Sequence, residues 1–175
     1  MKIFYLTILV FNIIFAEQKI IFQSANPFTF KDIIKENEKL EVQDVHGILR
    51  FPDNFDSNIK YPLVIGVAGS LGWHEHNYEY MEMYRNMGLA TFELKSFSSR
   101  DVSSTVGSQV EVTMASMIFD SYKALDTLSN HPNIDKDNVS ITGWSLGGGV
   151  ALFSAWENLV NAINPKNNFA AHLPI

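Results

Sequence analysis

A glycine–serine motif between a predicted strand and a predicted helix constrains this chain more than any other feature. An apolar strand predicted over 138–142 runs directly into Gly143-Trp144-Ser145-Leu146-Gly147, and a helix-prone stretch follows over 150–160. A serine at the tip of such a turn has a strained backbone, so the residues two positions away must lack bulky side chains. Gly143 and Gly147 meet that requirement. The pattern is typical of a nucleophile elbow, in which a reactive serine stands above a sheet edge.

This turn predicts roles for three of its residues. The hydroxyl of Ser145 would stand at the N-terminus of the following helix, where the N–H of Leu146 points to the place at which an oxyanion would form. Trp144 is predicted to shape a substrate pocket. No Gly-Lys-Ser or Gly-Lys-Thr follows, so the motif is not a phosphate-binding P-loop. A glycine-rich turn that serves packing alone is the alternative interpretation.

Composition narrows the function classes. The formal net charge of −6 disfavours nucleic acid and anionic membrane surfaces as partners. The 175 residues contain no cysteine, which excludes disulfides, thiolate catalysis and cysteine metal sites. His74-Glu75-His76 resembles a metal-binding pair, but histidines two positions apart do not share a helix face. We therefore expect a rim position for these histidines and neither a metal nor an organic cofactor.

The N-terminus reads as a targeting segment over residues 1–16. Lys2 is followed by an apolar run over 3–15 and by Ala16, a small residue at the expected cut. The run is too short to be a comfortable membrane span. A secreted or periplasmic protein is expected, and an anchor formed by an uncleaved signal is the alternative.

Strands and helices alternate along the rest of the chain. After a polar N-terminal segment over 17–41, with a short surface helix within 31–40, the pattern predicts a single domain over 42–175. The expected strands cover 42–52, 61–68, 89–94, 138–142 and 169–175, and the expected helices cover 75–87, 109–129 and 150–160. The order predicts an α/β fold with a mostly parallel sheet and helices on both faces.

The order of these motifs resembles the dienelactone hydrolase family of α/β-hydrolases. The resemblance rests on the apolar strand and glycine loop over 61–72, the Arg100 loop, the stretch over 120–138 and the serine motif over 143–149. It implies that Ser145 is the nucleophile and that the N–H groups of Leu146 and Ser70 bind the oxyanion. The small molecule that it acts on would be an ester.

Two departures from the family shape the expected function. Dienelactone hydrolases in the strict sense have a cysteine at the position of Ser145, so a general carboxylic ester is the expected substrate. The catalytic acid and histidine of this fold follow the nucleophile; Glu157 and His172 are the candidates here, and neither matches the family position. The resemblance therefore implies the N-terminal part of a longer serine hydrolase, truncated after the strand that follows the nucleophile helix and nearly inactive alone.

Other interpretations remain open at this point. Arg100 could hold a substrate carboxylate, or it could form an ion pair with Asp101 or another nearby acid. The whole chain could instead be a non-catalytic binding module, because the acid and the base are missing. A peptidase or an acyltransferase of the same fold is a further alternative.

Overall fold

The computed structural model describes residues 17–36 and 39–175. The predicted signal peptide over 1–16 lies outside the described residues. Within the described part of the chain, no helix combines the length and the apolar character needed to cross a membrane.

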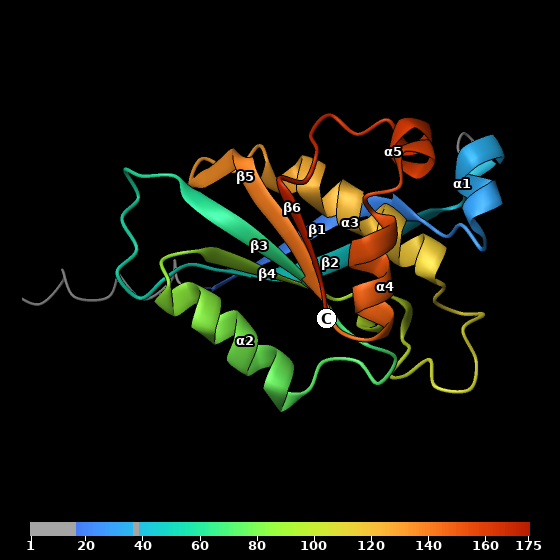
Figure 1. Cartoon of the computed structure of the whole chain (residues 1–175), viewed down its shortest axis with the longest axis horizontal. Coiled ribbons are helices and arrows are strands. Elements are labelled where there is room, and N and C mark those ends of the chain that lie inside the picture. The colour runs from blue at the N-terminus through green and yellow to red at the C-terminus, as the bar shows by residue number, and fades with distance from the viewer. Residues whose placement is uncertain (1–16, 37–38) are drawn as a thin grey trace, which may run out of the picture.

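In the described part of the chain, six strands form one sheet in the order β1-β2-β4-β3-β5-β6 (Figure 1). The strands are β1 (Glu17–Ala25), β2 (Val42–Arg50), β3 (Tyr61–Val67), β4 (Ala90–Leu94), β5 (Ile134–Gly143) and β6 (Ala171–Pro174). The three pairs among β3, β4, β5 and β6 are parallel, whereas β1 and β2 run antiparallel to their neighbours. The predicted α/β fold with a mostly parallel sheet is confirmed.

Helices lie on both faces of the sheet. They are α1 (Phe30–Glu36), α2 (Glu75–Asn86), α3 (Met114–Leu128), α4 (Leu146–Phe153) and α5 (Glu157–Ile163). Side chains alternate along a strand, and β3 shows the two faces directly. Ile65 belongs to the large core cluster that includes residues of α3 and α4, whereas a Cβ at the next residue, Gly66, would touch Met81 of α2. Figure 1 accordingly shows α2 (green) apart from α3 and α4.

The segment over 17–41 contains a strand that the sequence pattern did not predict. β1 pairs with β2 over its full length, so this segment is part of the same sheet. Its apolar residues do not alternate cleanly, because β1 is the edge strand and Ile21 remains 63% exposed. A strand of this kind carries a weak sequence signal.

The predicted helix over 109–129 begins five residues later, at Met114. Thr113 is its N-cap: its side chain accepts a hydrogen bond from the N–H of Ser116, and the Ser116 side chain accepts one from the N–H of Thr113, each 3.1 Å long. This reciprocal capping fixes the first turn of α3.

The predicted helix over 150–160 is two helices. α4 ends at Phe153 and α5 begins at Glu157, so the sequence prediction of one continuous helix is wrong. The Tyr122 hydroxyl donates a 2.6 Å hydrogen bond to the Ser154 carbonyl at the break. Because this carbonyl already has a buried tertiary partner, the backbone can leave the helical pattern without an unsatisfied group.

β5 begins at Ile134, four residues before the predicted strand. Its pairing with β3 is irregular and shifts register between Tyr61 and Leu63. There the Asp135 carboxylate accepts hydrogen bonds from the N–H of Asp137 and the amide of Asn138. The remaining predicted strands and the helix over 75–87 agree with the structure to within one or two residues.

Candidate active site

Ser145 occupies a backbone conformation that side chains rarely adopt. Its φ is 53° and its ψ is −111°, between the end of β5 and the start of α4. The side chain is exposed, whereas its neighbours Trp144 and Leu146 are buried. This combination presents the Ser145 hydroxyl at the tip of a sharp turn, and tertiary contacts must hold such a conformation in place.

The two flanking glycines leave no room for a side chain. A Cβ on Gly143 would lie 2.1 Å from the carbonyl oxygen of Gly147. A Cβ on Gly147 would lie 2.2 Å from the carbonyl oxygen of Val67, at the end of β3. The turn therefore packs backbone against backbone, which only glycine permits.

The N–H of Leu146 has no hydrogen-bond acceptor within helix α4. Leu146 is the first residue of α4, and the first N–H groups of a helix have no intrahelical acceptor. The carbonyl of Trp144 accepts the N–H of Gly147 at 2.8 Å, which closes the first turn of the helix. The positive end of the helix dipole lies at the same place and favours a negative charge there.

The loop that follows β3 lies directly against this turn. A Cβ on Gly69 would be 3.0 Å from the Trp144 carbonyl oxygen and 3.5 Å from the Ser145 Cβ. The loop closes on itself through a 2.9 Å hydrogen bond from the N–H of Gly72 to the carbonyl of Gly69. Ser70, the predicted second oxyanion donor, is therefore on a compact loop beside Ser145.

Ser145 and Ser70 line one small cavity of about 270 Å³. Trp144 forms part of its wall and packs against Trp73 and Tyr80 with ring centroids 6.1 and 5.7 Å apart. The other lining residues are Gly69, Leu71, Gly72, His74, His76, Asn77 and Val106. The structure thus brings together Ser145, Ser70 and Trp144 from two separate predicted loops.

His74 and His76 line the same cavity, at the start of α2. Their rings are nearly parallel, with centroids 6.4 Å apart, and both residues are exposed. Among the described residues, no group of three or more histidine and carboxylate side chains could hold a metal ion. These histidines had been expected on a rim, and they lie at the edge of the Ser145 cavity.

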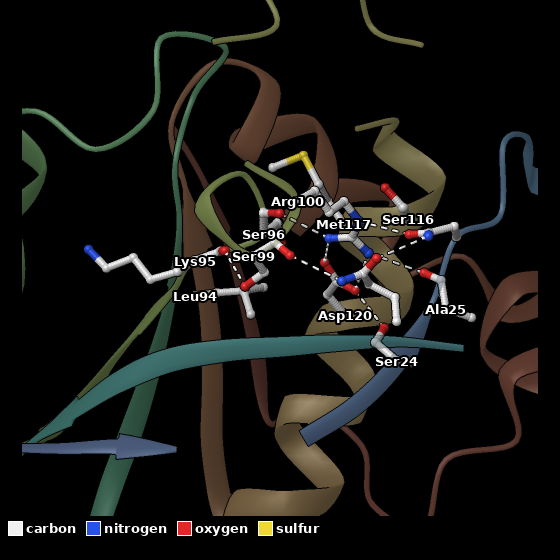
Figure 2. Close-up of polar contacts among 12 residues, drawn as sticks. Ser24, Ala25, Leu94, Lys95, Ser96, Ser99, Arg100, Ser116, Met117 and Asp120 are labelled. Atoms are coloured by element: carbon white, nitrogen blue, oxygen red, sulfur yellow. Dashed lines mark hydrogen bonds and ion pairs between the residues drawn. The ribbon is translucent and has the colours of Figure 1, made fainter. Parts of the chain in front are cut away.

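Arg100 does not point to a ligand, because it is fully engaged with the protein. Its guanidinium binds both carboxylate oxygens of Asp120, at 2.8 and 3.0 Å (Figure 2). The side chains of the two residues are 6% and 0% exposed. Of the two sequence interpretations, the ion pair describes the structure, and its acid is Asp120 on α3 rather than the adjacent Asp101. A substrate carboxylate has no access to this arginine.

A second cavity of about 310 Å³ shares Gly72 with the Ser145 cavity. Ala68, Gly72 and Trp73 form one wall, and residues of the loop after β4 form another. His46 of β2 also lines it; burial, and then the charges of Lys19 and Lys95, hold the pKa of its imidazole below the ordinary value. Sequence reasoning missed this cavity because its walls come from several separate segments that share no motif.

The two late candidates for the triad lie away from Ser145. His172 on β6 packs its ring against Phe169 and forms a hydrogen bond with the backbone of Ser154. Ser154 lies just beyond α4, at the end of that helix opposite Ser145. At about 1.5 Å per residue, α4 separates these ends by roughly 12 Å. Burial lowers the pKa of His172. Glu157 is exposed at the start of α5.

The comparisons with known proteins agree with this architecture. A family model described as acetyl xylan esterase (AXE1) matches residues 106–174, a segment that includes Ser145. No curated protein sequence matches the chain.

Solved structures with a similar fold include the following three. A dienelactone hydrolase-like promiscuous phosphotriesterase, P91, from metagenomic libraries is 16% identical, with a TM-score of 0.56 over 80% of this chain and 54% of its own. A protein named m3DLH is 20% identical, with a TM-score of 0.55 over 80% and 54%. A Bacteroides ovatus protein assigned as a dipeptidyl aminopeptidase IV is 20% identical, with a TM-score of 0.51 over 79% and 19%.

These matches establish the fold of the chain. It has the α/β-hydrolase fold, and its structural neighbours include dienelactone hydrolase-like proteins, as the sequence motifs predicted. The chain spans about half of the length of P91 and m3DLH, and about a fifth of the Bacteroides ovatus protein.

Proposed function

From the α/β-hydrolase fold of this chain, we propose that it is a serine hydrolase that cleaves carboxylic esters, with Ser145 as the nucleophile. The observation that carries the proposal is the conformation of Ser145. This exposed serine has a φ of 53°, on a turn whose close backbone packing leaves no room for a side chain at Gly143 or Gly147. A module that only binds ligands has no need of a strained serine, and such strain concentrates at functional sites. The acetyl xylan esterase model that covers this segment supports an esterase over other hydrolases.

In the proposed reaction, the Ser145 oxygen attacks the ester carbonyl carbon and the carbonyl oxygen becomes an oxyanion. The N–H groups of Leu146 and Ser70 donate to that oxygen. The bond to the alcohol then breaks, the alcohol takes the serine proton, and water releases the acid from the acyl-serine. The small volume of the cavity favours small esters, because it lies just below the range of typical ligand pockets.

The proposal includes a general base and an acid from sequence beyond residue 175, as the resemblance implies. The similar solved structures are longer than this chain, and the triad of this fold follows the nucleophile. Without a base, a serine hydroxyl is a weak nucleophile, and loss of triad members costs roughly 10⁴ to 10⁶ in rate. The 175-residue chain is therefore expected to hydrolyse esters slowly, and the proposed chemistry requires neither a metal nor an organic cofactor.

A labelling experiment tests this function without requiring turnover. The full-length protein, which would supply the proposed base and acid beyond residue 175, is incubated with an alkyl fluorophosphonate, which forms a covalent bond to an activated serine with loss of fluoride. Mass spectrometry is expected to find a single adduct on the peptide that contains Ser145. The Ser145→Ala variant should take up none, whereas Ser108→Ala, at an exposed serine of a neighbouring loop, should label as the natural chain does. Equal labelling of Ser145→Ala would refute the proposed nucleophile.

We also propose that residues 1–16 direct export and are removed. The protein isolated from cells that produce it should begin at Glu17. An intact Met1 in exported protein would instead favour the anchored alternative.

A further inference from the structure

The buried ion pair of Arg100 and Asp120 ties together three segments that are distant in sequence. All five N–H groups of the guanidinium are used: two bind Asp120, and the others donate to the carbonyls of Ser96 and Ala25 and to the side chain of Asn26. Figure 2 shows these contacts together with the Ser24 hydroxyl, which donates to the same carboxylate. The end of β1, the loop after β4 and α3 are thereby joined through one side chain.

The loop that Arg100 fixes continues to the site of Ser145. Four residues beyond Arg100, the Ser104 hydroxyl donates a 3.0 Å hydrogen bond to the Ser70 carbonyl, and the N–H of Thr105 donates a 2.8 Å bond to the same oxygen. The backbone is also close at Gly72, where a Cβ would lie 3.2 Å from the Ser103 carbonyl oxygen. The loop after β4 and the loop after β3 are therefore in direct contact, and two donors hold the Ser70 carbonyl.

We propose that Arg100 and Asp120 are positioning residues for the oxyanion donor at Ser70. This inference rests on the proposed serine hydrolase function. Ser104 and Thr105 hold the peptide group that follows Ser70, through its carbonyl. The peptide group that carries the Ser70 N–H is held through the Gly69 carbonyl, which accepts the N–H of Gly72 at 2.9 Å. The ion pair prevents the supporting loop from drifting relative to β1 and α3. An oxyanion donor stabilises the transition state only when the protein already holds its N–H in the direction of the developing negative charge.

Three variants interrupt this chain of contacts at different points. Arg100→Lys keeps the positive charge but loses the planar guanidinium with its five N–H donors. Asp120→Asn keeps the shape of the side chain but loses its negative charge. Ser104→Ala removes one of the two bonds to Ser70 at an exposed residue, and we expect it to fold even if the buried variants do not. The control is Glu93→Gln on β4. It disrupts the ion pairs of another buried carboxylate with Arg50 of β2 and with Lys95, just after β4, and none of these side chains bonds to the Ser70 carbonyl.

Two measurements distinguish positioning from a general loss of stability. The first is the kinetics of Ser145 labelling by the fluorophosphonate in the full-length protein, separated into the maximal rate and the half-saturating concentration. We expect Arg100→Lys and Asp120→Asn to lower the maximal rate about tenfold and Ser104→Ala about threefold, each with an unchanged half-saturating concentration, because loss of a whole donor costs roughly 10² to 10³. Glu93→Gln should stay within twofold.

The second measurement is amide hydrogen exchange of the intact chain. Exchange at Thr105 and Gly72 should become faster in the Arg100 and Asp120 variants and remain unchanged in Glu93→Gln. Equal slowing by Glu93→Gln, or faster exchange confined to residues near Arg100, would overturn the inference. If the full-length natural protein shows no Ser145 labelling, the proposed function fails, whereas the exchange data still decide whether the ion pair controls the Ser70 loop.

Discussion

The N–H of Ser145 donates a 2.9 Å hydrogen bond to the carbonyl of Ile175, which directly follows β6 and lies thirty positions later in the chain. The N–H of Ile175 in turn donates to the carbonyl of Gly143 at 2.9 Å. A Cβ on Gly148 would lie 2.5 Å from the Ile175 carbonyl oxygen, so the segment after β6 packs tightly against the turn. The unusual backbone of Ser145 is therefore held on both sides by tertiary contacts.

Replacement of Ser145 by glycine should stabilise the chain while it removes the nucleophile. Glycine adopts a positive φ without the steric cost that a Cβ imposes, so we expect Ser145→Gly to have a higher free energy of unfolding than Ser145→Ala by about 1 kcal/mol. Urea unfolding of both variants measures this difference. A lower stability of the glycine variant would mean that the backbone at this position is not strained.

Gly147→Ala and Gly149→Ala should differ strongly although both lie on α4. The Cβ at position 147 would collide with the Val67 backbone, which cannot move without disturbing β3, and we expect a loss of about 3 kcal/mol in the free energy of unfolding. The Cβ at position 149 would meet the flexible end of Met114, and the higher helix propensity of alanine compensates. Thermal and urea unfolding of the pair test this contrast.

Removal of the Tyr122 hydroxyl should destabilise the chain and change its response to alkaline pH. Tyr122→Phe loses the 2.6 Å bond to the Ser154 carbonyl, with an expected cost of about 1–2 kcal/mol. Burial raises the pKa of Tyr122 from 10.0 to about 12. The unfolded chain therefore releases this proton first, and stability should fall as the pH rises from 10 to 12. That fall should be smaller in Tyr122→Phe, as measured by unfolding at a series of pH values.

Acidification should weaken the fold through two half-buried histidines. Burial holds the pKa of His131 below its ordinary value of 6.5, and His172 is shifted in the same direction by the same cause. Below pH 6.5 the unfolded chain binds the proton more readily, so the free energy of unfolding should fall until the folded-state pKa is passed. The slope can reach about 1.4 kcal/mol per pH unit for each histidine. His131→Gln should reduce this slope, and a slope equal to that of the natural chain would contradict the prediction.

Local sequence patterns predicted most of the strands and helices of the fold. The continuous apolar run of β3 predicts a buried parallel strand, and the glycines at 143 and 147 predict a tight strand-to-helix turn, because both effects depend on residues close together in the chain. The start of α3 was placed too early, since the helical periodicity of 109–113 outweighed the cap at Thr113. β1 was missed because its edge position leaves its apolar residues only partly buried.

The candidate site also has a part that could be predicted from the sequence and a part that could not. Ser145, Leu146 and Trp144 belong to one short motif, so their relation to one another follows from the sequence. The approach of Ser70 to Ser145 depends on the neighbouring positions of β3 and β5 in the sheet. The partner of Arg100 could not be predicted from the sequence. Asp120 lies twenty positions later, on α3, and several other acids, including the adjacent Asp101, were equally plausible partners.

The sequence by itself therefore determined the fold class, the strained serine turn and the glycines that permit it, because backbone sterics act over a few residues. Only the tertiary structure decided which side chains meet across the sheet. It assigned Arg100 to Asp120, placed His74 and His76 at the Ser145 cavity and set Ile175 against the turn. These contacts depend on the packing of segments far apart in sequence, where burial and geometric fit select one partner among many chemically equivalent candidates.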